Sequence, residues 1–183
     1  MKRKLLILSV LAICLATLAA GTIAYFNSEG KAHNVITIGG VEIAVQEWAD
    51  EAKTTPFEDL TGVMPNTTVT KIAEIKNTGA SDAWVRVKVE KNIKLQGEGT
   101  PDTSLVELTR SASHWTEKDG YYYYTKPLKP GEVTAPIFTA VTFNANMGNE
   151  YQNATATVDV FAQAVQTANN GATVMDAQGW PRA

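Results

Sequence analysis

The chain has little of what covalent cross-linking and thiol chemistry need. Its only cysteine, Cys14, lies in an apolar run close to the N-terminus. Once that run is set aside, the rest of the chain cannot form a disulfide, a thiolate metal site or a thiol nucleophile. Exported proteins that lack cysteine are more usual in Gram-positive bacteria than among secreted animal proteins. We therefore expect a bacterial host.

Histidine is also scarce, and the residues are His33 and His114. The sequence has no His-Glu-x-x-His zinc motif, no Gly-x-Ser-x-Gly elbow and no glycine-rich phosphate loop after a strand. Acidic pairs such as Asp50-Glu51 fall in loops, where solvated charge is the simpler interpretation and calcium capture a minor alternative. We therefore predict that the protein is not an enzyme, with no catalytic, cofactor-binding or metal-binding residue and no cofactor.

Positive charge is in deficit as well. The formal net charge is −3, from 16 Lys and Arg against 19 Asp and Glu. Three of the basic residues stand at positions 2–4, so the chain after the leader carries 13 basic residues against 19 acidic ones, a net charge of −6. An acidic domain without a basic stripe is not expected to bind nucleic acid.

The N-terminus has the three parts of a secretory signal. Three basic residues at 2–4 precede an apolar run over residues 5–20, and small residues at 21–24 offer a cleavage site between Ala24 and Tyr25. The alternative is an uncleaved anchor, since residues 5–26 are long enough to span about 30 Å of hydrocarbon. Cleavage is favoured by the small residues, so we expect a signal peptide over 1–24, secretion to the medium or cell surface, and membrane contact only through the uncleaved signal.

Period-two alternation recurs through the remaining residues, whereas helical periodicity is nearly absent. The clearest case is residues 83–90, where Val85, Val87 and Val89 alternate with Trp84, Arg86, Lys88 and Glu90. Further strands are predicted within residues 35–46, 69–76, 121–124, 137–143 and 154–166, and the pair Asp119-Gly120 predicts a hairpin turn. Seven to nine strands behind an apolar signal helix predict an all-β antiparallel two-sheet sandwich over residues 25–167. Residues 168–183 form a tail, with a possible short helix near Trp180.

Four consecutive tyrosines, Tyr121, Tyr122, Tyr123 and Tyr124, are the most unusual local feature. On a strand they point alternately to opposite faces, so two are expected to pack inward and two outward. The simpler interpretation is cross-strand aromatic packing. The alternative is a surface strip that binds sugar or a protein partner, because an exposed tyrosine offers apolar area and a hydroxyl.

Several segments together resemble the TasA/camelysin (CalY) family of Gram-positive exported biofilm matrix proteins. The leader with its Gly-Thr-Ile-Ala-Tyr-Phe at 21–26 resembles that family's signal region, and Asn-Val-Ile-Thr-Ile-Gly at 34–39 resembles its first mature strand. Later segments follow in the same order as in exported proteins of this type: residues 77–79, 83–87, 119–124, 128–132 and 162–166. This chain is shorter than TasA and closer in size to the camelysin-type members.

The resemblance implies a jelly-roll-like sandwich that forms extracellular fibres by strand exchange, with a signal peptidase of the SipW type as a processing partner. The donor strand would be Val35, Ile36, Thr37 and Ile38 of one copy, freed by cleavage and completing a sheet in the next copy, so the main partner is the protein itself. Two other hypotheses stay open here. One is a monomeric cell-surface module that binds polysaccharide or a host protein; the weaker one is an exported camelysin-like metalloprotease.

Overall fold

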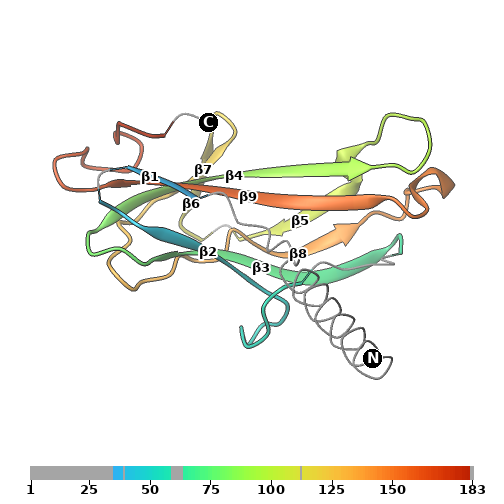
Figure 1. The fold of residues 1–183 in the computed structure, drawn as a ribbon, viewed down its shortest axis with the longest axis horizontal. Coiled ribbons are helices and arrows are strands. Elements are labelled where there is room, and N and C mark those ends of the chain that lie inside the picture. The colour runs from blue at the N-terminus through green and yellow to red at the C-terminus, as the bar shows by residue number, and fades with distance from the viewer. Residues whose placement is uncertain (1–34, 39, 59–63, 112, 182–183) are drawn as a thin grey trace, which may run out of the picture. The chain divides into compact units, whose positions relative to one another are not determined.

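A computed structural model describes residues 35–38, 40–58, 64–111 and 113–181, all within the compact unit His33–Ala183. The predicted signal segment 1–24 and the predicted cleavage site between Ala24 and Tyr25 lie outside the described residues. Among the described residues, no helix has the length and apolar character to cross a membrane. The fold is built from strands and two short 3₁₀ turns (Figure 1).

Nine strands form the two layers of a sandwich. They are β1 Val35–Ile38, β2 Ile43–Trp48, β3 Thr67–Asn77, β4 Ala83–Lys94, β5 Val106–Arg110, β6 Trp115–Lys118, β7 Tyr121–Tyr124, β8 Phe138–Phe143 and β9 Thr155–Gln166. One sheet has the order β1-β9-β4-β7-β6 and the other β2-β3-β8-β5. The predicted all-β, two-sheet antiparallel sandwich is confirmed, except that β1 pairs with β9 in parallel.

The chain passes repeatedly between the layers, which is how strands distant in sequence become neighbours. β4 and β9 pair antiparallel along their whole length, from Ala83 opposite Gln166 to Lys94 opposite Thr155. β8 lies between β3 and β5 in the other sheet. This winding of early strands against late ones is jelly-roll-like, since each sheet mixes strands from both halves of the chain.

The core lies between the sheets and follows the alternation of the sequence. Its fully buried members include Phe138, Ile75, Val85, Val87 and Leu128. Burying one such side chain stabilises the fold by roughly 1.5–3 kcal/mol. The predicted hairpin turn is also confirmed: Asp119 and Gly120 both have positive φ, 52° and 77°, as the tight turn between β6 and β7 requires.

A second apolar cluster lies on the outer face of the five-stranded sheet. Trp84, Tyr123 and Val165 pack there against Val174 and Ala177 of the C-terminal tail. On its outward face the alternating pattern of β4 is typical of a solvated surface, but Trp84 there is only 4% exposed because the tail covers it. The possible helix near Trp180 is wrong, since the described tail residues form turns and bends.

Candidate functional site

The predicted donor strand is an edge strand in this fold. Its four residues, Val35, Ile36, Thr37 and Ile38, pair in parallel with Ala162, Gln163, Ala164 and Val165 of β9. Gly40, with φ of +73°, lies between this strand and β2, which belongs to the opposite sheet. Gly40 thus lies where the chain changes layers, and its positive φ favours a residue without a Cβ.

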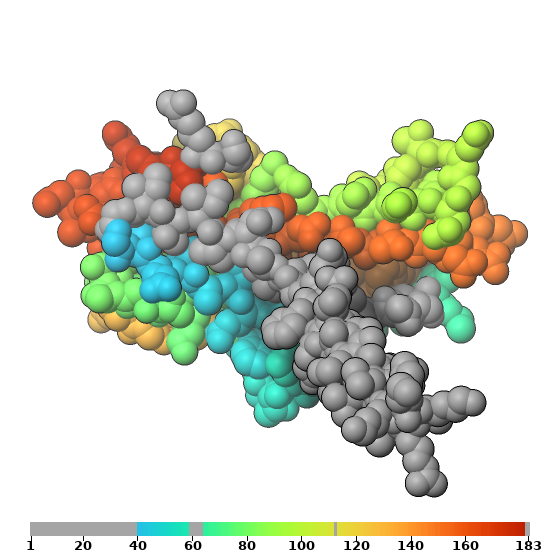
Figure 2. Space-filling view, in the orientation of Figure 1, coloured from blue at the N-terminus to red at the C-terminus, as the bar shows by residue number. Residues whose placement is uncertain are grey.

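The described residues cover the edge beside β1 only in part. β9 has 12 residues, and β1 pairs with four of them, residues 162–165. Within the described ranges, no strand pairs with residues 155–161 on the side of β9 away from β4. Figure 1 shows β9 continuing well beyond β1, and Figure 2 shows orange atoms, the colour of β9 and the residues just before it, at the surface of this face.

In the facing sheet, too, the edge strand pairs with only part of its longer neighbour. β2 pairs with residues 72–77 of β3, while residues 67–71 have no strand partner on that side among the described residues. These two segments, residues 155–161 of β9 and 67–71 of β3, are called the bare halves below, and both lie at the same end of the sandwich. At the other end, Asn77 Nδ2 donates to the Leu128 carbonyl, Leu128 bridges to Ala83, and Ala83 is paired with Gln166.

Inward-pointing residues of these bare halves are apolar and half-buried. Val69 stands on β3 opposite Val141, and Ala156 and Val158 of β9 pack against the main core. An uncovered strand edge exposes a row of N–H and C=O groups that can pair with another extended chain. The two halves together form a site suited to an added strand.

The edge of β2, by contrast, is capped. The segment after β2 folds back so that Phe57 N donates to the Glu47 carbonyl at 3.0 Å, and Pro56 bridges to Trp48. A proline on an edge has no N–H to offer a further strand. Addition at this side is therefore directed to β9 and β3 rather than to β2.

Charged side chains hold this cap in place on both faces of β2 and β3. Lys71 Nζ donates to Glu47 Oε2 at 2.7 Å and lies 4.0 Å from the centre of the Phe57 ring. Glu74 accepts from Trp48 Nε1 at 3.0 Å and from Lys53 Nζ. Glu74 is 3% exposed, so its two donors satisfy a carboxylate that water cannot reach.

The tyrosine run alternates as predicted, but it does not form an open strip. Tyr124 packs into the main core, and Tyr123 packs beneath the tail; they are 7% and 8% exposed. Tyr121 and Tyr122 are half-buried, each against an arginine: Arg86 lies 4.1 Å from the Tyr121 ring and Arg110 4.5 Å from the Tyr122 ring. Assigning Tyr123 and Tyr124 to a surface-binding site was wrong, because the tail and the second sheet cover them.

The described histidine, His114, lies near the start of β6. Its Nε2 is 3.1 Å from Lys126 Nζ, and its ring meets Tyr124 edge-on. In the part of the chain that the structure describes, no group of three or more His, Cys, Asp or Glu side chains could hold a metal ion. His33 lies outside the described residues.

Sequence reasoning missed the docking of the tail. Trp84 Nε1 donates to the Asn170 carbonyl at 3.0 Å, and the Trp180 ring meets Tyr123 edge-on at 6.0 Å. The available signal was the spacing of Val174, Ala177 and Trp180, apolar residues that recur at every third position of the tail.

Comparisons of the chain with protein-family models, with curated proteins and with solved structures found no match.

Proposed function

We propose that the chain is an exported structural subunit of extracellular fibres or biofilm matrix, assembled by exchange of β1 between copies after the signal is removed. The observation that carries this proposal is the pairing of β1: four residues lie in parallel against a 12-residue strand whose residues 155–161 have no strand partner, among the described residues, on the side away from β4. The resemblance of the leader and of residues 34–39 to the TasA/camelysin family supports the same proposal.

The geometry of β1 means that its exchange between copies costs little free energy. β1 adds one four-residue pairing to the five-stranded sheet and is joined to β2 through the turn at Gly40. When an identical strand from a second copy takes its place, the same backbone hydrogen bonds form again, so little free energy is lost. When the donor strand of each copy binds the acceptor edge of the next copy and the exchange is not reciprocal, the contact is head-to-tail and extends into a filament.

In this proposal, removal of the signal during export determines when assembly begins. While residues 1–24 are attached, the segment leading into β1 is held at the membrane. Cleavage between Ala24 and Tyr25 by a SipW-type signal peptidase would free it outside the cell. The partners are then other copies of the chain and the peptidase, and the function needs no catalytic residue, metal or cofactor.

The competing proposal of a monomeric module that binds through Tyr121–Tyr124 is weakened by the burial of Tyr123 and Tyr124. The proposal of a metalloprotease has no supporting side-chain cluster among the described residues. We therefore retain the fibre subunit as the single proposed function.

Two purified forms test this proposal, one starting at Tyr25 and one starting at Gly40. Electron microscopy should show filaments from the first and none from the second, because the second lacks the donor strand. Matching circular dichroism spectra would establish that both are folded. A synthetic peptide of residues 25–38 should bind the shorter form, whose β9 edge is vacant. Equal filament formation by the two forms would refute the proposal.

A further inference from the structure

The tail that follows β9 is a fixed part of the molecule. Residues 167–181 turn back over the outer face of the five-stranded sheet, where Val174 and Ala177 join Val165 of β9 in one buried cluster. Val174 is 2% exposed, as low as the side chains of the main core. The tail is therefore packed against the strand from which it emerges.

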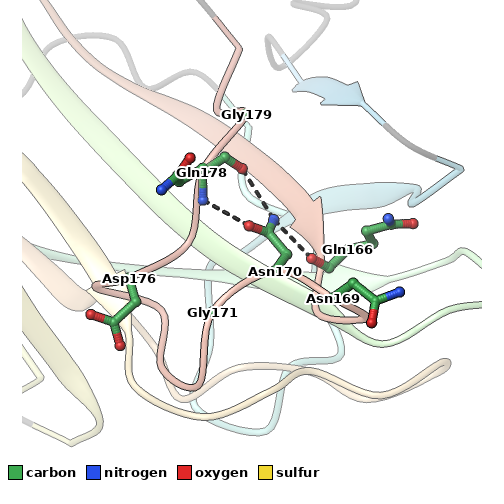
Figure 3. A pocket seen from close by; sticks show the side chains of 7 residues that line it. All are labelled: Gln166, Asn169, Asn170, Gly171, Asp176, Gln178 and Gly179. Carbon is green, nitrogen blue, oxygen red and sulfur yellow. Dashed lines mark hydrogen bonds between the residues drawn. The ribbon is translucent and has the colours of Figure 1, made fainter.

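One side chain, Asn170, ties the two arms of the tail together (Figure 3). Its Nδ2 donates to the Gln166 carbonyl at 3.1 Å and to the Gln178 carbonyl at 3.0 Å, and its Oδ1 accepts from Gln178 N at 2.8 Å. The next residue, Gly171, has φ of +76°, and a Cβ there would lie 2.9 Å from the Asp176 carbonyl carbon. The tail is thus held in its own shape as well as against the sheet.

Trp180 connects the end of the tail to β4 and, through β4, to β9. Its ring centre lies 4.6 Å from the Arg86 guanidinium, and the Tyr121 ring lies 4.1 Å from the same group. Arg86 Nε in turn donates to Gln163 Oε1 of β9 at 2.7 Å. Because a guanidinium stacks on aromatic rings and presents its donors in a rigid fork, the tail fixes the side chain of Gln163 through Arg86.

The residues of β9 that the tail covers are the ones that pair with β1. β1 lies against residues 162–165, and all four of these residues are buried. Ala162 and Ala164 belong to the main core between the sheets. Gln163 and Val165 lie on the outer face, where Arg86 and the tail contact them. The part of β9 that pairs with β1 is therefore shielded from water on both faces.

The bare half of β9, residues 155–161, lacks this cover on its outer face. The outer-face residues there are exposed or half-buried: Thr155, Thr157, Asp159 and Phe161. A backbone hydrogen bond is stronger where water is excluded, and segments whose backbone bonds are open to solvent unfold locally more readily. The tail therefore favours binding of a strand at residues 162–165 over binding at 155–161.

We propose that the docked tail makes residues 162–165 the strand-binding part of β9, with Trp180 as a positioning residue that acts through Arg86 and Gln163. The consequence for assembly rests on the proposed function, since the tail influences strand exchange only where exchange occurs. Each tail covers the β9 of its own copy, so it stabilises β1 of the same copy and β1 of another copy alike. The tail therefore sets how fast β1 is released and leaves the final balance between the two pairings nearly unchanged.

Hydrogen exchange of the unassembled chain that starts at Tyr25, followed by mass spectrometry at low protein concentration, tests the positioning role without reference to filaments. In Trp180→Ala, exchange of the backbone amides of residues 35–38 should accelerate by about three- to ten-fold, the factor expected for loss of a cation–π contact. The amides of β3 and β8 should keep their wild-type rates. Trp180→Phe, which keeps a ring beside Arg86, should restore most of the protection.

The matched control is Trp115→Ala in β6. Both tryptophans are half-buried, and both donate the indole N–H to a backbone carbonyl: Trp115 to Ala135 at 3.0 Å and Trp180 to Ala177 at 2.9 Å. The control should lower the global free energy of unfolding without a selective effect on residues 35–38. Unchanged exchange of residues 35–38 in Trp180→Ala, or an acceleration spread equally over all strands, would overturn the proposal.

Asn170→Asp loosens the tail by a second route, because a carboxylate oxygen replaces the amide N–H groups that donate to two carbonyls. It should accelerate exchange of residues 35–38 in the same way, and wild-type exchange there would contradict the proposal. In filaments carrying two labels, Trp180→Ala subunits should mix faster than wild-type subunits while the filament mass stays similar. Absence of filaments from the wild-type chain would refute the proposed function alone, since hydrogen exchange still decides the role of the tail.

Discussion

The two lateral sides of the sandwich differ in how fully their strands are paired. On one side, β5 and β6 are paired along their whole length with β8 and β7. Arg110 on β5 joins Glu117 on β6 through an ion pair of 3.0 Å, which links the two sheets. On the other side, among the described residues, β1 pairs with only four of the 12 residues of β9, and β2 with six of the 11 residues of β3.

The difference follows from how each side handles its strand edges. β6 ends the sheet with the exposed sequence Thr-Glu-Lys at 116–118, and charged side chains on a short edge strand discourage addition of another strand. The β1 side carries no such charges over residues 155–161 except Asp159. If the proposed strand exchange occurs, stability and assembly lie on opposite sides of one small domain, and a strand is exchanged without opening the core.

The largest expected effect comes from blocking β1. In the double variant Ile36→Pro/Thr37→Pro, one of the two lost N–H groups must face β9, because successive residues of a strand point to opposite sides. We expect filaments to disappear in electron micrographs. The free energy of unfolding should fall by only about 1–2 kcal/mol, because one four-residue pairing is lost.

The matched control for this experiment is Thr116→Pro/Glu117→Pro in β6, the four-residue edge strand of the opposite side. This variant should lose stability yet still form filaments at temperatures where it is folded. Filaments from the β1 variant, or their loss only in the β6 variant, would reverse the roles assigned to the two sides.

A second comparison measures how firmly each side is packed. Tyr124 stacks with Trp115 at 5.0 Å beside the closed side, and we expect Tyr124→Ala to cost about 3–5 kcal/mol, as for other large buried aromatics. Val158 is half-buried beside the open side, so Val158→Ala should cost about 1 kcal/mol or less. Urea denaturation measures both values.

Tyr124→Phe is the control, because it removes only the hydroxyl that accepts from Ala135 N at 3.4 Å. Its expected cost is about 0.5–1.5 kcal/mol. Similar costs for Tyr124→Ala and Val158→Ala would mean that the two sides are equally well packed, contrary to the comparison.

Residues 83–94 show how far sequence reasoning could go. Alternation placed Trp84 and Arg86 correctly on one face and Val85 and Val87 on the other. Period two, however, says which residues share a face and nothing about what covers that face. The tail over Trp84 joins positions 86 residues apart, a contact that no local pattern encodes.

The same limit applies to the candidate edge. Residues 35–38 were predicted as an extended donor strand, and they do form a strand. Their parallel pairing with residues 162–165 could not be predicted, since a four-residue run carries no information on its partner or direction. The tyrosine run shows the same limit: the favoured interpretation, aromatic packing, is confirmed by the contacts of Tyr124 with Trp115 and of Tyr121 with Tyr123, but the sequence did not show the tail and sheet that bury Tyr123 and Tyr124 and exclude them from a surface strip.

The smallest expected effect concerns the closed side and its dependence on pH. Burial raises the pKa of Tyr122 above its usual value, and the nearby Arg110 guanidinium opposes that rise. Since the folded state then holds the phenolic proton more tightly than the unfolded chain does, this group stabilises the fold below pH about 10. That stabilisation is lost as the pH rises through the pKa of the folded state.

Spectrophotometric titration at the phenolate absorption band, with Tyr122→Phe subtracted, isolates this group. Arg110→Ala should raise the pKa of Tyr122 further, because the opposing positive charge is removed. Glu117→Ala should lower it, because this carboxylate raises the pKa. The opposite order of the two variants would mean that the Arg110–Glu117 pair does not lie against Tyr122 in solution, and that the closed side is held by backbone pairing and core packing alone.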